Sequence, residues 1–322
     1  MLGGSLNIEI EEWRVQAHSS NVSHLSQQKA SRLGSVVRKE MFKGKTEYFD
    51  RLASGVAQDK TSRNSDTPNL DLDHSRRAVT TLTREWSTLV DKKDKLQNIH
   101  SPESEYAKAA SMALGRKMDA VIIAAANSTA ATGEAGASTT TLGNAQKIAS
   151  VSAGAISKLN VLALRTAKQL LDAAEAEGSR YFVLNASQLN ALLGQTEVTS
   201  SDYNSVKALV QGEVDTFLGF KFIRSELIPL FTTYDADDFI FNTSTGVYSA
   251  SGTDISGLGT AATHVAPFAF IGDGLILGMN DGAFTQIEPR ADKSYSMQVY
   301  ASMDFGAVRM EEAKVVSVAC LA

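Results

Sequence analysis

The sequence predicts an α+β protein in which two extended arms precede a folded body. The first hundred residues hold too few large apolar side chains to build a core of their own. One helix signal then runs from Ser101 to about Asn127, and alternating strands dominate the end of the chain. A length of 322 residues allows one large domain or two smaller ones.

Charge is unevenly distributed along this mildly acidic chain. Residues 1–100 hold 16 Lys and Arg against 13 Asp and Glu, whereas residues 130–322 hold 12 against 20. Opposite signs at the two ends suit self-assembly, and ordinary variation over a solvated surface explains them equally well. An acidic chain gains little from attraction to phosphate, so we expect at most incidental, sequence-independent contact with DNA.

Cysteine content and apolar runs limit the class of protein further. Cys320 is the only cysteine, which excludes an internal disulfide framework and a thiol metal cluster and indicates a reducing compartment. The first residues, MLGGSLNIEIEEW, do not read as a signal peptide. The sequence contains no apolar run of about 18 residues, so we expect no membrane contact.

The two arms occupy the first hundred residues. Apolar residues in 21–41 recur at roughly helical spacing, interrupted by Gly34, which predicts an amphipathic helix. A hairpin-like stretch follows over 45–91, in which 45–56 and 80–90 are the opposing strands and the intervening residues are mostly polar. A lone two-stranded ribbon is marginal in water, and its edges invite pairing with another chain. This region is therefore either disordered or lies on neighbouring copies, and its aromatic residues favour the second reading.

The long helix has the clearest start signal. Ser101, Pro102 and Glu103 read as an N-cap, a first-turn proline and a first-turn acid. At 1.5 Å per residue, about 25 residues make a rod of about 38 Å. We expect Val121 and Ile122 to be fully buried beneath the C-terminal strands. The polar face is expected to carry Lys108, Arg116, Lys117 and Asp119.

The rest of the chain reads as an α/β section followed by strands. Residues 128–158 are rich in small and polar residues and read as a surface excursion. Asn160 and Asn185 are expected to cap helices that run to Glu177 and to Gly194. A further helix is expected over 202–210, two strands bent at Leu218-Gly219, a hairpin over 239–250, and long strands over 296–303 and 314–319.

No pattern in the sequence carries enzymatic chemistry. Gly272-Asp273-Gly274 with Gly278 is not followed by the helix that a dinucleotide loop needs, so it reads as punctuation between strands. Asp304-Phe305-Gly306 matches a kinase tripeptide by letters, but the other kinase motifs are missing. The histidines and paired aspartates lack metal-ligand spacing. We therefore expect no enzyme, no cofactor and no metal.

Three stretches carry a resemblance to a known family. They are SPESEYAKAASMALGRKMDAVIIAAANSTAATGE, YNSVKALVQGEVDTFLGFKFIRSELIP and SYSMQVYASMDFGAVRMEEAKVVSVAC. In content and order they resemble the spine helix, the apical domain and the closing peripheral strands of tailed-bacteriophage major capsid proteins, the Hong Kong 97-like coat fold. The resemblance covers nearly the whole chain and lies in the order of parts.

The resemblance implies a division of the chain and a function. It implies an N-terminal arm (1–44), an extension loop (45–95), a peripheral domain (101–158 with 265–322, including the spine helix 101–128) and an apical domain (159–264). The implied function is a virion shell of hexamers and pentamers around double-stranded DNA, assembled in the host bacterial cytoplasm. A separate scaffolding protein and a portal protein are the further partners we expect.

The extension loop supplies the residues expected at contacts between copies. These candidate assembly residues are Tyr48, Phe49, Arg76, Arg77, Arg84 and Trp86. We expect the burial of Trp86 to come from a neighbouring copy. Two alternatives remain open: an encapsulin-like nanocompartment shell, which shares the fold without the DNA, and a nucleotide-binding enzyme built around residues 272–278.

Overall fold

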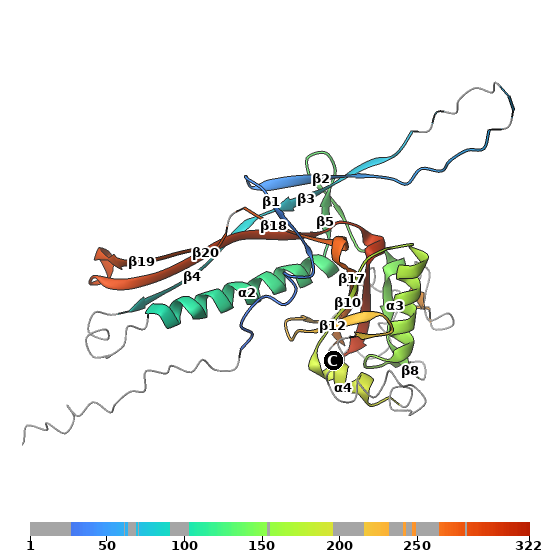
Figure 1. Cartoon of the computed structure of the whole chain (residues 1–322). Helices are drawn as coiled ribbons and strands as arrows, with labels where there is room; N and C mark the ends of the chain where they lie inside the picture. Colours follow the sequence, from blue (N-terminus) through green and yellow to red (C-terminus); the bar gives the residue numbers. More distant parts are fainter. Residues whose placement is uncertain are drawn as a thin grey trace, which may run out of the picture.

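Two large sheets, one long helix and a projecting hairpin are the main features of the described part of the chain (Figure 1). The computed structural model describes residues 27–60, 62–63, 69, 71–90, 103–152, 155–195, 216–231, 241–242, 247–248, 264–280 and 282–322. The predicted N-cap at Ser101 and the predicted helix over 202–210 lie outside the described residues. Among the described residues, no helix is long and apolar enough to span a membrane.

The long helix α2 spans Glu103–Asn127 and confirms the strongest helix prediction. Its apolar stripe is buried along most of its length, at Ala110, Leu114, Met118, Ile122 and Ile123. Two details of the prediction are wrong. Val121 is only partly buried against the main core, and Asp119, predicted on the polar face, is fully buried.

A five-stranded sheet lies along α2 (Figure 1). Its order is β1-β18-β20-β19, and β4 pairs with β20 on the other edge. The strands are β1 (Arg38–Met41), β4 (Leu82–Val90), β18 (Leu275–Met279), β19 (Phe284–Arg290) and β20 (Ser296–Arg309). The predicted pairing of the strand over 80–90 with that over 45–56 is wrong, because β4 pairs with β20 over nine residues of each strand.

The second sheet has eight strands and holds most of the core. Its order is β11-β12-β10-β17-β21-β16-β13, with β7 paired to β21. The strands are β7 (Lys147–Ala149), β10 (Arg180–Leu184), β11 (Thr216–Phe217), β12 (Phe220–Arg224), β13 (Leu230–Phe231), β16 (His264–Val265), β17 (Phe268–Ile271) and β21 (Val315–Leu321). Fully buried aromatic and β-branched residues fill it, including Phe182, Phe268, Phe270, Val316 and Val318.

Helices α3 (Val161–Ala173) and α4 (Ala186–Leu193) pack on this second sheet (Figure 1). The side chains of Asn160 and Asn185 accept hydrogen bonds from the third residue of each helix, which confirms both predicted N-caps. Helix α4 ends at Gly194 as predicted. Helix α3 ends four residues before the predicted Glu177, and the chain turns at Gly178 with φ +126°.

Several short elements complete the fold. The predicted bend at Leu218-Gly219 is confirmed between β11 and β12, where both residues have positive φ. The predicted hairpin over 239–250 is confirmed by the pairing of β14 (Phe241–Asn242) with β15 (Val247–Tyr248). The others are β8 (Val151–Ser152), β9 (Ala155–Ile156), η2 (Asn144–Gln146), η4 (Gly272–Gly274), η5 (Ala291–Lys293) and η6 (Glu312–Lys314).

The reading of 128–158 as a surface excursion is wrong for much of that segment. Strands β5 (Ala130–Thr132) and β6 (Ser138–Thr140) extend the sheet that carries the hairpin, and β7 pairs with β21 in the second sheet. Leu142, Ile148 and Ala149 are buried. Alanine and small polar residues are compatible with close packing between strands, so composition alone did not reveal this.

The projecting hairpin consists of β2 (Thr46–Leu52) and β3 (His74–Thr80). It belongs to a four-stranded sheet of order β2-β3-β5-β6, joined to the body where Arg77 pairs with Thr132. Beyond the hydrogen bond from Ala53 N–H to the Asp73 carbonyl (2.9 Å), residues 53–60 carry no regular structure and are exposed. The hairpin therefore projects away from both main sheets (Figure 1).

The amphipathic helix predicted over 21–41 is not formed over 27–41, and residues 21–26 lie outside the described part of the chain. Residues 27–37 make bends and turns, and β1 adds a parallel strand to β18. Leu33 and Val37 are buried, so the apolar spacing reflects anchoring to the body and not a helical face. Tertiary contacts override the local pattern here.

Each main sheet is built from segments that are distant in the sequence. In the eight-stranded sheet, β17 joins β10 to β21, which lies near the end of the chain. The turn η6 connects β20 of the first sheet to β21 of the second. This connection lies beside the root of the hairpin, because Glu312 of η6 contacts both hairpin strands.

Candidate assembly interface

The root of the hairpin, where β3 ends near Val79 and Thr80, packs against two glycines of the five-stranded sheet. Gly278 and Gly306 stand opposite each other in β18 and β20. A Cβ on Gly306 would lie 2.1 Å from the Thr80 carbonyl oxygen, and one on Gly278 would lie 2.7 Å from the Val79 side chain. Gly306 therefore lets the backbone of the hairpin approach the sheet, and Gly278 leaves room for the side chains of Val79 and Phe42.

A small apolar cluster holds the same root. Val79 of β3 is buried with Ala130, Ile276 and Val308, and Phe49 of β2 packs against this group. Phe49 was expected to contact a neighbouring copy, but the structure places it partly buried within its own chain. Its contribution is therefore to fasten the hairpin to the body.

Three arginines converge on Glu312 at the same place. Arg77 of β3 and Arg51 of β2 both donate to the Glu312 carboxylate, Arg51 over 3.4 Å. Arg309 of β20 lies 3.8 Å from it. Arg77 was expected at an intersubunit contact, but it is buried and paired within its own chain.

Tyr48 and Arg76 lie on the outward side of the hairpin. The Arg76 guanidinium lies 5.5 Å from the centre of the Tyr48 ring and 2.6 Å from an Asp50 carboxylate oxygen. The hydrogen bond from Arg76 lowers the pKa of Asp50 from its ordinary value. Tyr48 is exposed and Arg76 is partly exposed, so of the candidate assembly residues in β2 and β3 these two remain open to another molecule.

Arg84 and Trp86 belong to β4 and not to the projecting hairpin. Trp86 stands opposite Ala301 in β20 and packs against Ala110 and Leu114 of α2. Within its own chain these contacts leave Trp86 half-buried, and its further burial by a neighbouring copy stays a prediction. The Arg84 guanidinium lies 5.9 Å from the Phe305 ring centre, also within the chain.

The outer half of the five-stranded sheet turns one face away from α2. Register puts Glu85 and Leu89 of β4, Tyr300 of β20, and Phe284 and Glu288 of β19 on this face, which we call the distal sheet face. Tyr300 packs edge-on against Phe284, with ring centres 6.4 Å apart, and donates a hydrogen bond to Glu85 (3.2 Å). Phe284 and Leu89 are exposed.

The anchor of the N-terminal segment lies on the other side of the molecule, on α2. The fully buried Asp119 carboxylate accepts hydrogen bonds from the Gln28 side chain, the Ser31 hydroxyl (2.5 Å) and the backbone N–H groups of Arg32 (2.9 Å) and Leu33 (3.1 Å). We call this arrangement the Asp119 clamp. It fixes where the N-terminal segment leaves the body.

Sequence reasoning missed Asp119, Arg309 and Glu312. The one signal for Asp119 is its position between Met118 and Ile122 of the apolar stripe, with Gly115 one turn before it. A Cβ on Gly115 would lie 3.0 Å from the Ser31 backbone nitrogen, so the crossing chain needs this glycine. For Glu312 no local signal exists, because Arg51 and Arg77 are 261 and 235 positions away.

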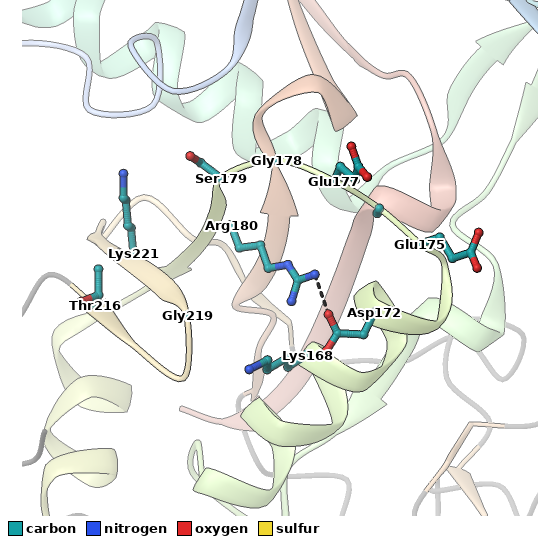
Figure 2. A pocket seen from close by; sticks show the side chains of 11 residues that line it. Lys168, Asp172, Glu175, Glu177, Gly178, Ser179, Arg180, Thr216, Gly219 and Lys221 are labelled. Carbon is teal, nitrogen blue, oxygen red and sulfur yellow. Dashed lines mark ion pairs between the residues drawn. The ribbon is translucent and has the colours of Figure 1, made fainter.

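A hollow beside the C-terminal end of α3 is a separate feature (Figure 2). Its lining mixes Lys168, Arg180 and Lys221 with Asp172, Glu175 and Glu177. Arg180 and Asp172 form an ion pair of 2.5 Å across it. The lining includes no histidine or cysteine, and within the described part of the chain no group of residues is arranged to hold a metal ion.

Comparison with known proteins identifies similar molecules. A family model described as phage capsid protein matches residues 10–322. No curated protein matches the sequence. The capsid protein of Ralstonia phage GP4 is 12% identical, with 96% of each chain covered and a TM-score of 0.70.

Two further solved capsids share the arrangement. The cyanophage P-SCSP1u capsid protein is 15% identical, with 97% of this chain and 94% of that chain covered and a TM-score of 0.65. The capsid protein of Helicobacter pylori bacteriophage KHP30 is 11% identical, with 100% and 99% covered and a TM-score of 0.65. At these identities the similarity shows the fold alone, and it confirms the predicted α+β coat fold.

Proposed function

Since this chain belongs to the phage capsid protein family, we propose that its copies join as hexamers and pentamers of an icosahedral shell around double-stranded DNA. It is a major capsid protein, a structural component of the virion that forms the phage shell. The nanocompartment shell and the nucleotide-binding enzyme are not favoured by these matches. The glycines of 272–274 form a short 3-10 turn followed directly by β18, with no helix to hold a pyrophosphate.

The exposed hairpin is the main observation that supports assembly with other copies. Leu52 at the end of β2 and Val56 beyond it have 58% and 78% of their surface exposed, on a ribbon that projects from the body of its own chain. A ribbon of this kind is stabilised when it pairs with or lies on another chain. In a shell, identical copies are the partners at hand, and head-to-tail contacts between them close into rings.

The distal sheet face is the surface that we propose receives the hairpin of a neighbouring copy. It exposes Phe284 and Leu89 beside Tyr300, so it offers apolar and aromatic area to the apolar side chains of the hairpin. Of the candidate assembly residues, Tyr48 and Arg76 are the ones proposed to touch the neighbour directly. Phe49, Arg77, Arg84 and Trp86 would act indirectly, by holding the hairpin and the receiving sheet in place.

Other partners belong to the same proposal. The resemblance to tailed-phage coat proteins implies two further protein partners, a separate scaffolding protein and a portal protein. It also implies non-specific contact with the packaged DNA and assembly in the host bacterial cytoplasm. The acidic composition supports weak and sequence-independent contact with DNA, because phosphate attraction requires a basic surface.

Limited trypsin digestion tests the intersubunit role of the hairpin. Trypsin is expected to cut the free subunit after Lys60 and Arg63, because exposed backbone without regular structure is readily cleaved. In assembled shells the same cuts should be at least about tenfold slower, because the neighbour covers the hairpin. Fragments identified by mass spectrometry report the two sites. Equal cutting rates in subunits and shells would contradict the proposed contact.

A further inference from the structure

Glu312 joins three parts of the fold that are far apart in the sequence. Its carboxylate accepts hydrogen bonds from Arg51 on β2 and Arg77 on β3, the two strands of the hairpin. Arg309, 3.8 Å away, donates to the carbonyl oxygens of Ala126 (3.0 Å) and Ser128 (2.7 Å), at the end of α2. We call Glu312 and these three arginines the Glu312 node.

The charges of the node do not balance. Three guanidinium groups face one carboxylate, and Arg77 and Arg309 have only 2% and 0% of their surface exposed. Burial lowers the pKa of both guanidiniums from the ordinary value, and the nearby Glu312 carboxylate opposes this effect. The Nε atoms of both buried arginines have no hydrogen-bond partner among the described residues. Glu312 is therefore the counter-ion on which two buried cations depend.

The position of the node links the hairpin to the joint between the sheets. Glu312 lies in η6, the turn between β20 of the five-stranded sheet and β21 of the eight-stranded sheet. A rotation of one sheet against the other displaces this turn. Because the Glu312 carboxylate is hydrogen-bonded to both strands of the hairpin, such a displacement would also move the hairpin root.

We propose that Glu312 is a positioning residue that sets the angle at which the hairpin leaves the body and makes this angle follow the joint between the two sheets. The consequence for the shell rests on the proposed function: a hairpin that lies on a neighbour fixes the angle between two copies, and hence the curvature. Arg51 also donates to the Met310 carbonyl (2.6 Å), which holds β2 to the strand end before η6.

Hydrogen exchange on the isolated subunit tests the first half of the proposal. Glu312→Gln keeps the shape and one acceptor but removes the counter-ion. The backbone amides of β2 and β3 are expected to exchange about tenfold faster or more, while those of β10 and β17 keep their wild-type rates. Glu311→Gln is the matched control, because Glu311 lies beside Glu312 and pairs with Lys314 (2.9 Å) and with none of the three arginines.

Three outcomes would overturn the positioning role of Glu312. Unchanged exchange in β2 and β3, or an equal rise in every strand, removes the positioning role, and so does an equal effect of Glu311→Gln. Should Glu312→Gln not fold, Arg51→Gln removes one arm of the node and leaves the buried Arg77–Glu312 pair intact. In Arg51→Gln we then expect the same increase in amide exchange rate, confined to β2 and β3. Unchanged exchange rates in these two strands would overturn the proposal.

Electron microscopy of assembled protein tests the second half. Glu312→Gln is expected to give shells of altered diameter or open curved sheets, and Glu311→Gln to give shells of wild-type size. Local loosening of the hairpin together with shells of wild-type size would refute the link to curvature. Wild-type protein that forms no shells would count against the proposed function instead, and the exchange result would still decide the positioning role.

Discussion

Replacing Asp119 by alanine is expected to destabilise the subunit by about 3–5 kcal/mol, the loss expected when several buried donors lose their acceptor together. The carboxylate is fully buried and accepts hydrogen bonds from two side chains and two backbone N–H groups of the segment 28–33. Each donor left buried without an acceptor costs about 1–3 kcal/mol, and relaxation of the segment recovers part of the sum. The N-terminal segment should detach from α2 at the same time.

Urea unfolding of the isolated subunit measures this effect. Asp119→Asn keeps one acceptor oxygen and should fall between wild type and Asp119→Ala. Lys117→Ala is the control, because Lys117 is exposed on the same helix and its removal should change stability by less than about 0.5 kcal/mol. Wild-type stability in Asp119→Ala would mean that the clamp does not hold the segment.

Leu114→Asp is the second substitution with a large expected effect. Leu114 is buried in the small apolar contact between α2 and β20, against Ala301 and Trp86. An unpaired carboxylate there costs several kcal/mol, about 4 or more, because no partner replaces its hydration. The subunit should be insoluble, or should lose the near-ultraviolet circular dichroism of Trp86.

Lys108→Ala on the same helix provides the comparison. Its side chain is exposed and forms a surface ion pair with Glu105 one turn away (2.7 Å), so its loss should leave solubility and shell yield unchanged. Soluble Leu114→Asp protein with wild-type near-ultraviolet signal would show that α2 does not pack on β20 as described.

Local signals in the sequence were sufficient for the helices and for most late strands. Asn160 and Asn185 identify two helix starts because an asparagine side chain can satisfy a free backbone N–H at that position. The length of α2 follows from its uninterrupted apolar stripe. Local signals do not predict which strands pair. β4 and β20 are more than 200 positions apart, and the alternation of residues along β4 does not indicate its partner strand.

The candidate site was harder to predict than the fold. Periodicity assigns a charged residue to the surface, so Asp119 was predicted on the polar face of the helix and Arg77 at a contact between copies. Both are buried because their partners come from remote segments, residues 28–33 for Asp119 and η6 for Arg77. Trp86 was assigned to the projecting hairpin because its packing on α2 is a tertiary contact, which the local sequence pattern does not show.

Cryo-electron microscopy of particles formed by the wild-type protein tests the central claim most directly. The claim is that the chain builds a closed shell in which the β2–β3 hairpin of each copy lies on a neighbour. The expected density shows hexamers and pentamers, with residues 46–60 of each copy lying over the distal sheet face of the next. A closed shell whose hairpins fold back on their own copy, or project free of any neighbour, would contradict the account.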